Sequence, residues 1–96
     1  MNEETKEYGL LEHYLMSMLL SNKQTITNLC SKLNVSRQTF YNWINSIHPP
    51  SFDTVMEMSE ILATTDDEVY SISRQIWICI YEDRISKIKE KEDENG

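Results

Sequence analysis

The stretch from Thr25 to Leu62 constrains the fold most, because it has the pattern of two short helices joined by a tight turn. In the segment TITNLCSKLNVSRQTFYNWI, apolar side chains recur at helical spacing on either side of Asn34 and Val35. Asparagine tolerates a left-handed backbone better than any residue except glycine, so Asn34 is expected to end the first helix. Ser36 is then expected to cap the second helix by accepting from its free backbone N–H groups.

A further helix is expected after a proline turn. Pro49 and Pro50 cannot continue the second helix, and Ser51 is placed to cap the next one. The apolar sides predicted for these three helices consist of Leu29, Cys30 and Leu33; of Phe40, Trp43 and Ile44; and of Phe52, Val55, Met56, Met58, Ser59 and Leu62. The small side chains of Cys30 and Ser59 suit positions where two helices cross closely.

These residues resemble the Xre and Cro type helix-turn-helix family of phage repressors, over roughly the middle half of the chain. The family pattern is matched by Leu29, Cys30, Asn34, Val35, Ser36, Phe40, Trp43 and Pro50. The chain departs from that pattern at the turn, where Asn34 replaces a glycine, and at Ile26, Ile44 and Ser46. The resemblance implies an all-α fold with a five-helix repressor-like domain. An additional C-terminal helix, discussed below, goes beyond the family's minimal domain. It also implies a DNA-binding function.

The second helix of the pair is expected to read bases. Its inward residues leave Arg37, Gln38, Tyr41, Asn42 and Asn45 outward. Arginine pairs with guanine, and glutamine or asparagine pairs with adenine, through edges that are distinguishable in the major groove. The first turn of such a helix reaches the bases, which selects Arg37, Gln38, Tyr41 and Asn42 for base reading. The alternative is a polar helix face that only meets solvent.

A second set of residues is expected to contact DNA phosphates. Backbone amides and the positive end of the helix dipole, at the start of the first helix of the pair, suit a phosphate. The predicted phosphate contacts are Lys23, Thr25, Thr27, Asn28, Ser36, Asn45 and His48.

The charge distribution favours nucleic acid, although the net charge of −7 opposes it. No Asp or Glu occurs between Ser21 and Phe52, whereas Lys23, Lys32 and Arg37 lie there. The acidic residues collect at the N-terminus, after Phe52 and in the C-terminal tail. The alternative is chance segregation of charge in a short chain.

The flanking segments are also expected to be helical. A first helix from about Thr5 to Ser21 has an apolar stripe of Leu11, Tyr14, Leu15, Met18 and Leu19. Thr65 and Glu68 have the spacing of a capping box, which predicts a fifth helix from Asp66 to about Ser73. Residues 1–73 are therefore assigned to the DNA-binding domain.

Residues 74–96 are assigned to a C-terminal helix with a frayed acidic tail. One side of the C-terminal stretch that begins at Ser71 (Ile72, Ile76, Cys79 and Ile80) is expected to cover the domain. The other side (Ile78, Tyr81, Ile85 and Ile88) is expected to form a homodimer. Two alternatives stay open: a strand formed by the β-branched and aromatic run IWICIY, or the whole segment folded back as the core of a monomer.

Several classes of protein are not indicated by the sequence. It contains no Ser-His-Asp set, no glycine-rich phosphate loop, and no carboxylate and histidine pair for acid and base catalysis, so no enzyme and no cofactor are expected. Cys30 and Cys79 lie in apolar stripes without a CxxC partner, and His13 and His48 lack spaced ligands, so no metal site is expected. The acidic start resembles no signal peptide and no apolar run approaches membrane-spanning length, which predicts a cytoplasmic protein that does not bind membranes.

The sequence thus predicts a sequence-specific regulator of transcription that binds double-stranded DNA, repressor-like and of phage or mobile-element type. It would bind a palindromic operator as a homodimer. The alternative is a protein-binding module or inhibitor on the same fold, with the acidic surface as its partner site.

Overall fold

The chain is all-helical in the computed structural model, which describes the backbone of residues 9–45 and 47–95 and the side chains through residue 89. Its five helices are α1 (Leu10–Ser21), α2 (Ile26–Leu33), α3 (Arg37–Ile44), α4 (Phe52–Leu62) and α5 (Asp66–Asn95). The all-α prediction is confirmed. Residues 5–8 of the predicted first helix lie outside the described residues. Among the described residues, α1 begins at Leu10.

The C-terminal part differs from the expectation of two separate helices. α5 is one continuous helix of 30 residues, so the predicted boundary between residues 73 and 74 falls inside it. The physical reason is that the sequence has no Gly or Pro from Ser51 to Asn95 to interrupt the helix. The IWICIY run is helical rather than a strand, because residues at helical spacing pack on the rest of the molecule. Ile72, Ile76 and Cys79 are buried there.

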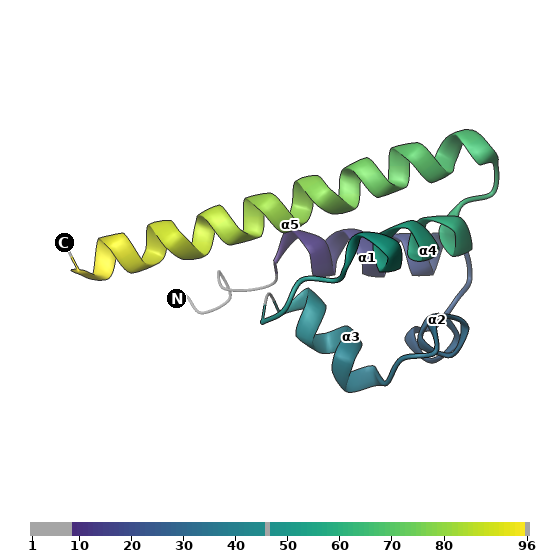
Figure 1. Cartoon of the computed structure of the whole chain (residues 1–96), viewed down its shortest axis with the longest axis horizontal. Helices are drawn as coiled ribbons and strands as arrows, with labels where there is room; N and C mark the ends of the chain where they lie inside the picture. The colour runs from purple at the N-terminus through teal and green to yellow at the C-terminus, as the bar shows by residue number, and fades with distance from the viewer. Residues whose placement is uncertain (1–8, 46, 96) are drawn as a thin grey trace.

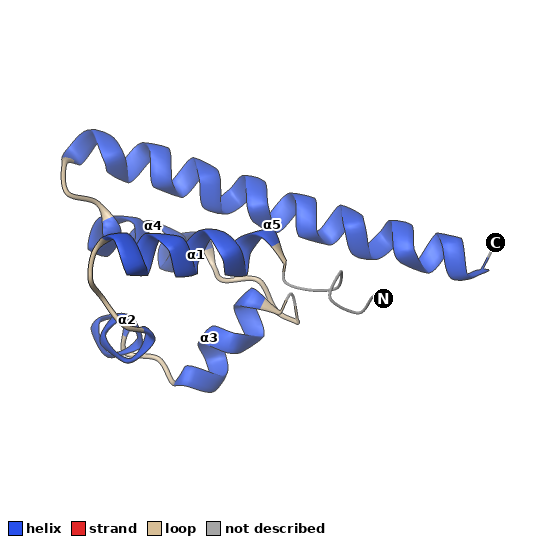
Figure 2. Cartoon of the chain, turned by 180° about the vertical axis from the view of Figure 1, so that it is seen from behind, coloured by secondary structure: helices blue, strands red, loops and turns tan. Residues whose placement is uncertain are grey.

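The helices lie in layers, with α1 and α4 between α5 on one side and α2 with α3 on the other (Figures 1 and 2). α5 packs against α4 and α1, and α2 packs against α4 and α3. The side chains with the least exposure are Phe40, Leu11, Leu15, Leu29, Met58, Leu62, Ile76, Val55 and Ser59. The core therefore fills the space around the α1 and α4 layer.

Most of the predicted core is buried, with one clear exception. Phe52 was expected on the inner side of α4 but is 65% exposed. It is the first residue of that helix, ahead of the buried positions Val55, Met58, Ser59 and Leu62, so the core ends before it. Tyr14, Met18 and Met56 are half-buried.

The predicted caps of the last two helices form with one change. The Ser51 hydroxyl accepts from the backbone N–H of Thr54 at 3.1 Å, and the Thr65 hydroxyl accepts from that of Glu68 at 3.3 Å. The Glu68 carboxylate reaches back one residue further than a capping box requires, to the backbone N–H and hydroxyl of Thr64. These two hydrogen bonds, the backbone one first, lower the pKa of Glu68 because they stabilise its ionised form.

α1 is capped by a residue distant in sequence. Its N-cap is Gly9, which has no side chain to accept from the first backbone N–H groups. Asp83 of α5 does so instead: one carboxylate oxygen accepts from the N–H of Leu10 at 2.8 Å and the other from that of Leu11 at 3.1 Å. A Cβ at Gly9 would lie 2.9 Å from an Asp83 oxygen, so the glycine makes room for the carboxylate. The middle of α5 is thereby joined to the start of α1.

Candidate nucleic-acid interface

The turn between α2 and α3 has the predicted left-handed residue. Asn34 has φ 60° and ψ 46°, and its backbone N–H donates to the carbonyl oxygens at the end of α2. The Val35 N–H donates to the Cys30 carbonyl at 3.0 Å, which closes the turn. This short connection sets the direction in which α3 leaves α2.

Replacing Asn34 with alanine is expected to lower the free energy of unfolding by about 1 kcal/mol, because a Cβ-bearing residue without a local amide is strained at this φ. Asn34→Gly should be close to neutral, since glycine adopts the conformation freely. Urea denaturation midpoints measure the difference. The matched control is Asn45→Ala. Asn45 is exposed like Asn34, but its φ of −94° lies outside the left-handed region. Equal losses at the two positions would contradict the role given to the turn.

α3 presents a polar face to solvent. Its buried residues are Phe40, Trp43 and Ile44, as predicted. Arg37 and Gln38 in its first turn are exposed. Tyr41 and Asn42, one turn further on, are half-buried. The Tyr41 ring packs edge-on against Phe40, with ring centroids 5.9 Å apart. Three of the four predicted base-reading side chains therefore carry amide or guanidinium groups on one accessible face.

Two amide side chains on this face are hydrogen-bonded to each other. Gln38 Nε2 donates to Asn42 Oδ1 at 3.0 Å. This bond leaves Gln38 Oε1 as an acceptor and Asn42 Nδ2 as a donor. An acceptor and a donor side by side match the N6 donor and N7 acceptor of adenine in the major groove.

The hydroxyls of the two capping residues are used within the protein. The Ser36 hydroxyl accepts from the backbone N–H of Thr39, and the Thr25 hydroxyl accepts from that of Asn28, both at 3.1 Å. Thr25 also donates to the Asn28 side chain. The predicted Ser36 cap is confirmed, Thr25 caps α2 in the same way, and these residues fix the first turns of α2 and α3. The structure thus gives Thr25 and Ser36 a structural task in addition to the predicted phosphate contact.

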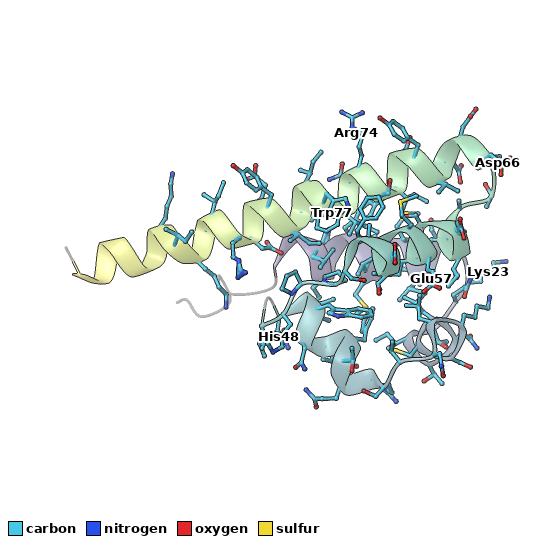
Figure 3. All side chains as sticks on the ribbon, in the orientation of Figure 1. Lys23, His48, Glu57, Asp66, Arg74 and Trp77 are labelled. Carbon is cyan, nitrogen blue, oxygen red and sulfur yellow. The ribbon has the colours of Figure 1, made fainter. Side chains whose placement is uncertain are left out.

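The other predicted phosphate contacts lie around the α2 and α3 layer. Lys23, in the turn before α2, and His48, in the loop after α3, are exposed at the two ends of this layer (Figure 3). Thr27, Asn28 and Asn45 are exposed as well. Lys23 has a left-handed backbone, with φ 56°. These side chains flank the polar face of α3 on both sides.

Both cysteine side chains lie in the core. Cys30 and Cys79 are free and buried. Burial raises the pKa of the Cys30 thiol, with a smaller opposing effect of the nearby Arg37 charge. Burial likewise raises the pKa of Cys79. Among the residues that the structure describes, no group of three or more His, Cys, Asp or Glu is placed to hold a metal ion. No helix in the described ranges is both long and apolar enough to cross a membrane.

The predicted dimerisation residues lie on the side of α5 that faces away from α1 and α4. Ile78, Tyr81 and Ile88 are 45%, 66% and 53% exposed, and Ile85 is half-buried. Beside them lies an open groove of about 540 Å³ that the sequence analysis missed, lined mainly by Trp77, Tyr81, Ile80, Arg84 and Pro49. Only the placement of the proline loop against α5 reveals it, so no local sequence signal would have identified it.

Comparison of the chain with protein-family models, curated protein sequences and solved structures finds no match to any of the three.

Proposed function

We propose that this protein is a sequence-specific regulator that reads double-stranded DNA with α3 and holds the phosphate backbone with residues around α2. The observation that carries the proposal is the polar face of α3. There Arg37 and Gln38 are exposed in the first turn, and Gln38 and Asn42 are hydrogen-bonded as a donor and acceptor pair. The resemblance to Xre and Cro type repressors supports the same role. The acid-free segment between Ser21 and Phe52 adds an electrostatic reason.

A dimer belongs to this proposal because one copy offers few positive charges. The segment that forms the candidate interface carries only Lys23, Lys32 and Arg37, besides His48. Each phosphate contact contributes to affinity through counterion release, so one copy is expected to bind weakly and with a shallow salt dependence. A second copy linked through α5 adds a second DNA-reading face, which raises the affinity by effective concentration where both faces reach sites on one DNA molecule.

Selection of sites from random duplexes, with the full chain as bait, tests the proposal. A recovered consensus sequence that competes with random DNA supports it. Recovery of random sequence alone, or no binding at low salt, overturns it and leaves the protein-binding alternative on the acidic surface.

Lys23→Ala is expected to weaken binding to selected and random duplexes by the same factor, because a phosphate contact carries no sequence information. It should also make the plot of log affinity against log salt less steep by about one unit. Fluorescence anisotropy titrations at several salt concentrations measure both quantities. A loss confined to the selected duplex would show that Lys23 reads bases instead.

A further inference from the structure

The exposed apolar side of α5 has two parts with different shapes. The first part, Ile78 and Tyr81, borders the groove formed with Trp77 and Pro49. The second part, Ile85 and Ile88, lies beyond Asp83, the position that joins α5 to the start of α1. The helix continues to Asn95, which is about 18 Å past Asp83 at 1.5 Å per residue. One helix therefore has a groove near its middle and an apolar arm near its end. Figure 1 shows this end of α5 extending past the other helices.

We propose that two copies of this chain pair through α5 in antiparallel orientation, so that the arm of each copy fills the groove of the other. The spacing of the apolar residues is three, four and three, as in a coiled-coil seam. Antiparallel pairing about Asp83 sets Ile78 against Ile88 of the second copy, and Tyr81 against Ile85. Trp77 and Ile88 lie on the same flank of this stripe. A two-fold axis perpendicular to both helices therefore brings Ile88 of one copy to the groove of the other.

Parallel pairing would fit the same residues less well. It would bring the arm of each copy to the level of the other arm, and the two grooves would lie on opposite flanks of the seam. Neither groove would then be filled, and a packed interface does not tolerate such unfilled space.

This pairing also determines where the DNA-reading faces lie. Arg74 points away from the body on the α5 side, and His48 lies on the opposite side with α2 and α3 (Figure 3). In an antiparallel pair, the two α3 helices therefore face outward at opposite ends. Successive half-sites of one palindrome require both reading helices on the same side of the dimer. We infer that the pair bridges two separate duplex segments, and this second step, unlike the pairing itself, depends on the proposed DNA-binding function.

Disulfide trapping tests the orientation. Ile78→Cys protein and Ile88→Cys protein, distinguished by a mass tag on one of them, are mixed and oxidised. Antiparallel pairing predicts that the mixture forms the cross-linked heterodimer. Each variant alone should stay uncross-linked, because its two cysteines would lie about ten residues, or roughly 15 Å, apart along the pair. The wild type, with its buried Cys30 and Cys79, is the control for adventitious oxidation.

Cross-linked homodimers of each single variant would show parallel pairing and overturn the proposal. A wild type that sediments as a monomer at all concentrations would overturn it as well. Both substituted positions are exposed, so the variants are expected to keep the helical circular dichroism of the wild type.

Bridging is measured by energy transfer between two differently labelled duplexes, each carrying one selected site. The expected result is transfer with the wild type and loss of transfer with Ile85→Asp combined with Ile88→Asp, while each duplex is still bound. Cross-linking without any DNA binding would refute the proposed function and leave the pairing intact. Specific DNA binding by a monomer would refute the pairing and leave the function intact. Binding of one palindromic duplex by the dimer would refute the bridging step alone.

Discussion

Asp83→Ala is expected to lower the free energy of unfolding by about 2 to 4 kcal/mol, because its carboxylate supplies both hydrogen bonds at the start of α1. Asp83 is only 8% exposed, so water does not readily replace it. For a chain of 96 residues this loss corresponds to a fall in Tm of roughly 10 to 20 °C. Thermal unfolding followed by circular dichroism gives the value. The neighbouring exposed residue supplies the matched control, and Glu82→Ala should change Tm little.

A second substitution separates the cap from other effects of the change. Gly9 has the extended backbone of an N-cap residue, with φ −72° and ψ 166°. In the wild type a side chain at this position would meet the Asp83 carboxylate. Once Asp83 is alanine, a serine at position 9 can cap α1 from the N-cap position itself. Gly9→Ser should then recover about 1 kcal/mol of the free energy of unfolding. If Gly9→Ser lowers stability equally in both backgrounds, the carboxylate does not act as the cap.

Replacing Gln38 and Asn42 together with alanine is expected to cost about 2 to 4 kcal/mol of binding to the selected duplex, or roughly 30-fold to 1000-fold in affinity. Each single substitution should cost about 1 to 3 kcal/mol. The double loss should be smaller than the sum, because each side chain positions the other through the 3.0 Å hydrogen bond. Binding to random duplexes should change little, since neither residue contacts phosphate in the proposal.

Titrations of the wild type, both single variants and the double variant against selected and random duplexes give the full cycle. Stability should be preserved, because both side chains lie on the outer face of α3 and bond only to each other among the contacts described. An equal loss on selected and random DNA would overturn the assignment of base reading. Strict additivity would show that the hydrogen bond between them has no part in recognition.

The parts of the fold that follow from local chemistry were predictable from the sequence. The left-handed Asn34, the Ser36 and Ser51 caps, and the inward stripe of α3 each depend on residues a few positions apart. Such features are set by backbone N–H groups that need partners and by helical spacing. The positions of the candidate base-reading residues were predictable for the same reason. They are the outward positions of a short helix whose inward positions are apolar.

The two main features that were not predicted depend on residues far apart in the chain. The Asp83 cap joins positions 73 residues apart, and the groove requires a proline loop to meet α5. Two smaller differences are local. The Glu68 carboxylate accepts from Thr64 instead of Thr65, and Phe52 is exposed at the start of α4. One local signal was available for the Asp83 cap: Gly9 starts a helix without any capping oxygen, which indicates that another segment must supply one.

The distance in sequence between Asp83 and the start of α1 has a consequence for the order of folding. During synthesis from the N-terminus, the residues of α1 to α4 have all been added to the chain well before Asp83. The contacts within α2, α3 and α4 are local and can form early, whereas closing a loop of 73 residues is slow and entropically costly. We therefore expect the reading helix to be assembled while the first turn of α1 still frays. In a refolding experiment, amide protons of Leu10 and Leu11 should then become protected from exchange after those of α3.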